Sequence, residues 1–156
     1  MLRLDIPGAQ SLLLDHLVLD FNGTLAGDGV LLAAARGRLE RLSHSIRIHV
    51  VTGDTFQRAR IELAGLPCEL HVLEPLEQTR AKLEYVQRLG PGRTACIGNG
   101  RNDALMMEAA ALGIAVVQAE GAAAATLAAA DVVTHDIGDA LDLLLYPQRL
   151  AATLRT

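Results

Sequence analysis

The sequence predicts an α/β fold, a three-layer, Rossmann-like arrangement in which helices cover both faces of a mainly parallel sheet. Short apolar and β-branched segments alternate with helix-period segments along nearly the whole chain, which is the pattern that βαβ units produce. Polar, glycine-containing turns follow several of the predicted strands, and open parallel sheets bind ligands at that position. The 156 residues have the length of one domain, which we expect to span 1–156.

The predicted elements begin with a β-hairpin, whose strands at 2–6 and 11–14 are joined by Pro7-Gly8-Ala9-Gln10. We expect this hairpin at the margin of the sheet. The first core strand is expected at 16–21, and a glycine-rich turn leads from it to a helix at 31–42 and a strand at 46–51. Further helices are expected at 55–64, 78–89, 102–111, 122–129, 137–145 and 147–154, and further strands at 69–73, 94–97, 113–117 and 131–134.

Composition argues against several classes of function. The net charge of −4 and the 3% aromatic content lack the features of a nucleic-acid-binding protein. No apolar run approaches the ~20 residues of a membrane span. Asp5 and Pro7 interrupt the N-terminal region in which a signal peptide would need a continuous apolar segment. We therefore expect a cytoplasmic protein without a membrane partner. Cys68 and Cys96 lie far apart in apolar stretches, which favours buried thiols over a disulfide.

One lysine stands out in this chain. Of the 14 basic residues 13 are arginine, and Lys82 is the only lysine. A compact ammonium differs from a planar guanidinium, so a single retained lysine hints at a position that requires a point charge. Chance in a chain of biased composition is an equally good explanation of this feature taken alone.

Three predicted strands end in short polar segments that would meet at one edge of a parallel sheet. Lys82 lies on the helix before the last of these segments. Together they bring carboxylates, a hydroxyl, an ammonium and amides to one rim, which suits phosphoryl transfer. The segments are Asp20-Phe21-Asn22-Gly23-Thr24, Thr52-Gly53-Asp54 and Gly98-Asn99-Gly100-Arg101-Asn102-Asp103.

Each part of a phosphoryl-transfer site has a candidate residue. Asp20, at the end of its strand, can attack phosphorus and form an aspartyl phosphate. Mg²⁺ is the cofactor that this chemistry implies, because it is a hard ion that binds carboxylate and phosphate oxygens. Thr52, with the adjoining Gly53, and Lys82 are the candidates that would bind the phosphate group.

These residues, in this order, resemble the four motifs of the haloacid dehalogenase (HAD) superfamily. The segment from 97 through Gly98-Asn-Gly-Arg-Asn-Asp103 to 133 is particularly similar to the phosphorylation domain of P-type ATPases and to small soluble proteins related to it. The resemblance implies that Asp20 is phosphorylated, that the backbone carbonyl of Asn22 binds Mg²⁺, and that Thr52 and Lys82 bind phosphate. It also implies that residues 99–103, with Asn99 and Asp103 as metal ligands, complete the site.

Two residues depart from the pattern of the superfamily. Its phosphatases generally have an aspartate two residues after the nucleophile, and Asn22 cannot do that acid-base work. We therefore expect slow turnover and a substrate with a good leaving group, such as an acyl or aryl phosphate. Asn99 stands where a Mg²⁺-binding aspartate is usual, so metal affinity should be weaker unless Asp103 supplies the carboxylate, directly or through water.

The sequence also supports other interpretations. A non-catalytic phosphate-binding or regulatory domain is the rival hypothesis, because Asn22 and Asn99 replace carboxylates. Asp54 is better interpreted as a helix N-cap, and for Asn102 capping and substrate binding are equally supported. The short stretches between motifs leave no room for a sizeable cap domain. Because the rim of the site would then be open, we expect either a homo-oligomer or a large substrate to cover it. The substrate would be a small phosphorylated molecule or a phosphoprotein.

Overall fold

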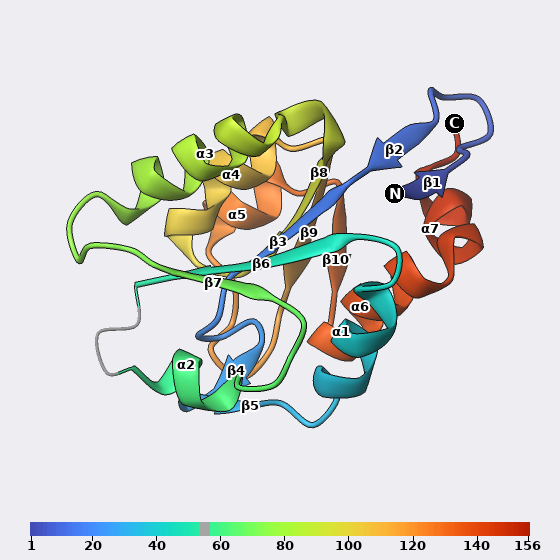
Figure 1. Cartoon of the computed structure of the whole chain (residues 1–156). Coiled ribbons are helices and arrows are strands. Elements are labelled where there is room, and N and C mark those ends of the chain that lie inside the picture. The colour runs from blue at the N-terminus through green and yellow to red at the C-terminus, as the bar shows by residue number, and fades with distance from the viewer. Residues whose placement is uncertain (54–56) are drawn as a thin grey trace.

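The computed structural model describes residues 1–53 and 57–156, and its centre is a six-stranded parallel sheet (Figure 1). The strand order is β10-β9-β8-β3-β6-β7, so the first core strand of the sequence lies in the interior of the sheet. The strands are β3 (His16–Leu19), β6 (Arg47–Thr52), β7 (Glu69–Val72), β8 (Thr94–Gly98), β9 (Leu112–Val116) and β10 (Val132–Thr134).

Helices cover both faces of the sheet, which confirms the predicted three-layer α/β fold (Figure 1). One layer holds α3 (Gln78–Leu89), α4 (Ala104–Ala109) and α5 (Ala124–Ala129). The other holds α1 (Arg36–Leu42), α6 (Ile137–Leu145) and α7 (Pro147–Leu154). A short helix, α2 (Arg58–Glu62), precedes β7, and single 3₁₀ turns stand at Pro91–Arg93 (η1) and Arg101–Asp103 (η2).

The period-two alternation of the strands divides the core between the two faces. In β3, Leu17 and Leu19 pack into the larger cluster with α1 and α6, whereas Val18 packs with α3 and α4. In β8, Ile97 joins the larger cluster and Cys96 the smaller one. Because the central strands are apolar on both faces, the sheet is buried and its polar residues are concentrated at strand ends.

The N-terminal hairpin forms as predicted, but it does not extend the main sheet. Strands β1 (Leu2–Leu4) and β2 (Leu12–Leu14) make a separate two-stranded sheet, and Leu4 and Leu14 are buried. The chain passes directly from β2 into β3, so the hairpin projects beyond the end of the sheet, beside α7 (Figure 1).

The helix expected at 31–42 is shorter than predicted. Strands β4 (Ala26–Gly27) and β5 (Val30–Leu31) form a small antiparallel hairpin, and α1 begins only at Arg36. Asp28 and Gly29 both have positive φ angles, 51° and 78°, which build the tight turn. Of the helix expected at 55–64, Arg58–Glu62 is helical; the capping role expected for Asp54 lies outside the described residues.

Candidate active site

The predicted site residues gather at the carboxyl ends of three adjacent strands. Asp20 follows β3, Thr52 ends β6, and Asn99 follows β8. Leu19 is paired with Val50 on one side and Ile97 on the other, so Asp20 lies between the other two motifs. The parallel strand order therefore explains why three segments distant in the sequence share one edge of the sheet.

Lys82 is the residue that joins these segments. It lies on α3, its side chain is fully buried, and its Nζ is 2.6 Å from Asp20 Oδ1 and 2.6 Å from Asp103 Oδ1. A buried ammonium is stable only when it is paired and hydrogen-bonded, and the two carboxylates supply both. The ammonium of Lys82 thus lies at the end of a long buried side chain, between two carboxylates.

Asp103 holds the loop after β8 as well as Lys82. Its Oδ2 accepts hydrogen bonds from the backbone N–H groups of Asn99 (3.0 Å) and Gly100 (2.9 Å), while its Oδ1 accepts from Lys82. Both oxygens of this carboxylate therefore have partners within the protein. Asp103 acts here through Lys82 and the loop, and its predicted role as a metal ligand would require one of these bonds to be shared or replaced.

The electrostatics of the cluster follow from its burial. Burial raises the pKa of Asp20 to about 6, with repulsion from Asp103 adding to the effect and Lys82 opposing it. For Lys82, burial disfavours the ammonium, but the attraction of Asp20 and Asp103 together raises the pKa of the side chain. The carboxyl of Asp20, the candidate nucleophile, therefore changes its protonation state at a pH of about 6. A nearby divalent cation would favour its ionised form.

The side of Asp20 away from Lys82 is lined by oxygen atoms. Thr24 is fully buried, and its hydroxyl lies 3.1 Å from Asn99 Oδ1 and 3.4 Å from Asp20 Oδ2. The 3.4 Å contact from Thr24 is long, so this hydroxyl does not by itself saturate Asp20 Oδ2. Carboxylate, amide and backbone oxygens are the donors that Mg²⁺ takes. The predicted ligands Asp20, Asn22 (through its backbone carbonyl) and Asn99 therefore fit Mg²⁺ chemically.

The predicted phosphate-binding residues lie on the other side of the site. Thr52 is buried at the end of β6, and its carbonyl accepts the N–H of Leu73 at 2.7 Å. A Cβ on Gly53 would collide with the side-chain amide of Gln78, whose Oε1 in turn accepts a hydrogen bond from Asn102 Nδ2 at 3.1 Å. Gln78 thus connects Gly53 to Asn102, a role that no motif indicated.

The loop after β9 also contributes to this edge, and sequence reasoning missed it. Gln118 Nε2 donates to the carbonyls of Gly23 (3.0 Å) and Thr24 (2.9 Å), and its Oε1 accepts the N–H of Ile137 at 2.9 Å. The rule that ligands bind beyond parallel strand ends pointed to this loop as well, because β9 ends at the same edge. Its residues match no motif, so the sequence alone does not single them out.

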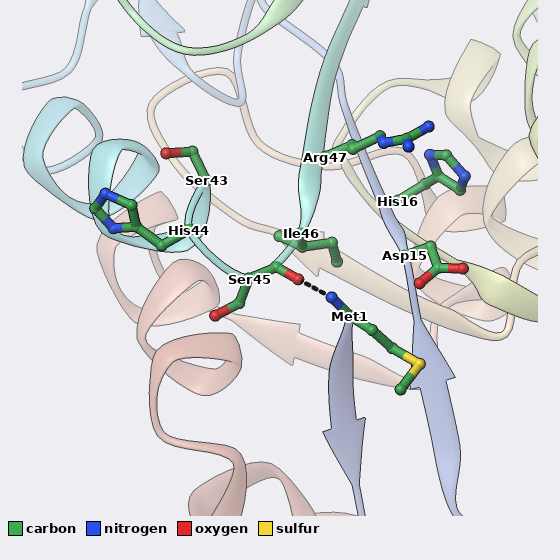
Figure 2. A pocket seen from close by; sticks show the side chains of 8 residues that line it. All are labelled: Met1, Asp15, His16, Ser43, His44, Ser45, Ile46 and Arg47. Carbon is green, nitrogen blue, oxygen red and sulfur yellow. Dashed lines mark hydrogen bonds between the residues drawn. The ribbon is translucent and has the colours of Figure 1, made fainter.

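A separate cavity of about 370 Å³ lies at the opposite end of the sheet (Figure 2). Asp15, His16 and Arg47, at the amino ends of β3 and β6, are among its lining residues, and the amine of Met1 donates to the carbonyl of Ser45 there. His16 precedes Asp20 by four residues, or roughly 13 Å of extended strand. This cavity therefore belongs to the end of the molecule away from the phosphoryl-transfer candidates.

Comparison with solved structures identifies the fold. The chain superimposes on the cobalt-bound deoxy-D-mannose-octulosonate 8-phosphate phosphatase of Haemophilus influenzae with a TM-score of 0.71 and 20% identity, covering 92% of this chain and 94% of the other. The 3-deoxy-D-manno-octulosonate 8-phosphate phosphatase of Moraxella catarrhalis, solved with magnesium, phosphate and KDO, gives a TM-score of 0.66 at 18% identity. This match covers 91% of this chain and 94% of the other. A Legionella pneumophila protein assigned to subfamily III A of the HAD superfamily gives a TM-score of 0.72 at 19% identity, with 90% of this chain and 87% of the other covered.

The chain therefore has the fold of the HAD superfamily, which is the fold that the resemblance of its motifs implied. No protein-family model matches the sequence. The sequence is 47% identical over 74 residues to the uncharacterized protein MJ0073 of Methanocaldococcus jannaschii, a match that covers 47% of this chain and 80% of the relative. The chain belongs to the same family as MJ0073. Among residues 1–53 and 57–156, none of the helices has the length and apolar character needed to cross a bilayer.

Proposed function

We propose that this protein is a Mg²⁺-dependent phosphatase or phosphotransferase that works through an aspartyl phosphate on Asp20. The observation that carries the proposal is the buried ammonium of Lys82, 2.6 Å from both Asp20 and Asp103, at the carboxyl edge of the sheet. This arrangement places a cation beside the carboxylate that would attack phosphorus. The likeness to phosphatase structures supports the fold in which such a site is set.

In the first step a carboxylate oxygen of Asp20 forms a bond to phosphorus while the bond to the leaving group breaks, and that group departs with the electron pair. In this proposal Lys82 neutralises charge on the phosphoryl oxygens, and the Thr52 hydroxyl and the Gly53 backbone bind the same oxygens. Mg²⁺, held by Asp20, Asn22 and Asn99, would supply further positive charge. Water or an acceptor then attacks the aspartyl phosphate and regenerates Asp20.

The choice of leaving group follows from Asn22. Its side chain is an exposed amide and can neither protonate a departing alkoxide nor activate water. The leaving groups of acyl phosphates, phosphoanhydrides and aryl phosphates are weakly basic and can depart without being protonated. We therefore propose that these compounds react faster than sugar phosphates. The named substrate of the neighbouring phosphatases, an octulosonate 8-phosphate, is a sugar phosphate, and Asn22 argues against direct transfer of that specificity to this chain.

The second candidate is a phosphate-binding or regulatory domain with little or no turnover. It rests on Asn22 and Asn99, which replace an acid-base group and a charged metal ligand. In either case we propose a small phosphorylated molecule or a phosphoprotein as the partner, a cytoplasmic location, one domain over 1–156, and a homo-oligomer that covers the open rim.

The decisive experiment measures Mg²⁺-dependent phosphate release from acetyl phosphate, p-nitrophenyl phosphate, ATP and sugar phosphates. The wild type is compared with Asp20→Ala, and Asn22→Asp tests the missing acid-base group. We expect release that Asp20→Ala abolishes and Asn22→Asp accelerates about a hundredfold, the lower range of a general acid-base contribution. If neither the wild type nor Asn22→Asp releases phosphate, while phosphate still raises the melting temperature, the binding-domain alternative replaces the enzyme.

A further inference from the structure

We infer that Glu120 belongs to the magnesium site and supplies the negative charge that Asn99 lacks. The inference deepens the proposed function, because it concerns the same metal site. It rests on the placement of the loop after β9, which no motif of the sequence indicated. Glu120 is a metal-site residue in this proposal, acting on the ion directly or through one of the water molecules that Mg²⁺ retains.

The loop that carries Glu120 is fixed against both metal-site segments. Within the loop, the N–H of Gly121 donates to the carbonyl of Gln118 at 2.8 Å, which closes a tight turn around Glu120. Gln118 Nε2 ties the turn to the carbonyls of Gly23 and Thr24, at 3.0 and 2.9 Å. The position of Glu120 is therefore set by hydrogen bonds on either side of it, while its own side chain stays exposed.

A second tie connects the turn to Asn99. The side-chain Nδ2 of Asn99 donates to the carbonyl of Gly121 at 3.0 Å, and the N–H of Ala123 donates to the carbonyl of Asn99 at 2.8 Å. The amide nitrogen of Asn99 thus faces the turn, which leaves its Oδ1 beside the hydroxyl of Thr24 at 3.1 Å. An aspartate could not donate the bond to Gly121, so Asn99 and this turn are matched to each other.

Gly23 shows how closely Glu120 approaches the metal side. A Cβ built on Gly23 would collide with Glu120 Oε2 and also with both polar atoms of the Asn99 side chain. The carboxylate of Glu120 and the amide of Asn99 therefore lie against the same α-carbon, three residues after Asp20. Gly23 has a φ of +79°, so both its conformation and its missing side chain are required for this approach.

The charge balance explains why a carboxylate is needed here. Asp20 and Asp103 carry two negative charges and Lys82 one positive charge, which leaves a net charge of −1 (two minus one). Glu120 brings the site to −2, which matches the charge of Mg²⁺. In residues 1–53 and 57–156 no three acidic, histidine or cysteine side chains form a metal cluster by themselves. Amide and backbone oxygens and water must therefore complete the coordination sphere.

The test is a titration of the full chain with Mg²⁺ in the absence of substrate. Calorimetry measures the affinity, and the rise of the melting temperature with Mg²⁺ concentration checks it. We expect Glu120→Gln to weaken Mg²⁺ binding about tenfold, the scale on which supporting residues act at metal sites. Glu40→Gln is the matched control, because Glu40 is an exposed glutamate on α1 and should leave the affinity unchanged. In the Glu120→Gln background, Asn99→Asp returns a carboxylate to the site but loses the hydrogen bond to Gly121, and it should recover part of the lost affinity.

The outcomes separate this inference from the proposed function. If Glu120→Gln binds Mg²⁺ as tightly as the wild type, or if the wild type binds no Mg²⁺, Glu120 has no place in a metal site. If Glu120 controls Mg²⁺ binding but no phosphate ester or acyl phosphate is turned over, the inference stands and catalysis is refuted. Because the readout is metal affinity, the result does not depend on finding the substrate.

Discussion

At the scale of single residues, the site depends on one cation shared by two acids. Lys82 is buried between Asp20 and Asp103, at 2.6 Å from each. Removing a buried partner leaves an uncompensated charge, so the three side chains must be considered as one unit. The order of the motifs pointed to all three residues, and the absence of any other lysine drew further attention to Lys82. The hydrogen bonds of Asp103 to the loop could not be predicted, because they depend on the conformation of residues 99–103.

The raised pKa of Asp20 predicts a pH dependence of stability in the metal-free protein. The folded pKa is about 6 against 3.8 for the unfolded chain, so the folded state binds more protons between these values. The free energy of unfolding should therefore fall as the pH rises from 4 to about 6, by at most about 3 kcal/mol for this group. Asp20→Asn cannot ionise and should lack this component.

Urea unfolding of both proteins between pH 4 and 8, with a chelator present, measures the difference. The wild type should lose stability relative to Asp20→Asn across the titration and stay parallel to it above pH 7. A stability difference that is constant over the whole range would show that Asp20 titrates normally. Added Mg²⁺ should reduce the effect in the wild type, since it stabilises the ionised carboxylate.

At the scale of elements, α3 is the helix that brings Lys82 to the site. Tyr85, one turn further along α3, is buried, and its hydroxyl lies 2.9 Å from His49 Nδ1 on β6. His49 Nε2 in turn lies 3.0 Å from His16 Nδ1 on β3. A chain of polar contacts therefore anchors α3 to two strands of the sheet. Neither histidine belongs to a motif, and the pairing required the strand register, which the sequence does not reveal.

We predict that Tyr85→Phe destabilises the protein by about 1 kcal/mol, because it removes one buried hydrogen bond and leaves His49 without that partner. Tyr146→Phe is the control: Tyr146 is 41% exposed, and Arg41 Nη2 donates to its hydroxyl at a long 3.4 Å, so little change is expected. Equilibrium denaturation of both variants gives the two values. Equal effects of the two substitutions would show that the His49 contact does not anchor α3.

The elements themselves were predictable where hydrophobic period and length agreed. The helix at 78–89 and the strand at 94–97 match α3 and β8 closely, since each has a clear apolar face or run between turn residues. The errors fall where glycines are frequent. Residues 26–31 form a hairpin instead of leading into a helix, and Asp28 and Gly29 adopt positive φ angles in its turn. Asp-Gly is a favoured pair for a two-residue hairpin turn, so the sequence carried this signal, although the strands on either side of it are only two residues long.

At the scale of the whole molecule, one sheet serves both helical layers. Leu17 and Leu19 face α1 and α6, and Val18 between them faces α3 and α4. The loss of either layer would expose the apolar side chains that the same central strands present to it. The order of the strands also places Asp20 between its partner segments, so the fold and the site depend on the same parallel pairings.

This shared sheet predicts that the chain unfolds as one cooperative unit, in agreement with the single domain expected from its length. The two tyrosines offer a direct test, because the chain has no tryptophan. Tyr85 lies on α3 in one layer, and Tyr146 lies between α6 and α7 in the other. Tyr85→Phe leaves Tyr146 as the fluorophore, so its fluorescence reports the layer of α6 and α7. Tyr146→Phe leaves Tyr85, so its fluorescence reports the layer of α3.

Within each variant, the fluorescence and far-ultraviolet circular dichroism transitions should share one midpoint. Separate midpoints would mean that a helical layer detaches before the sheet unfolds, and Lys82 would then leave Asp20 at a lower temperature than global unfolding.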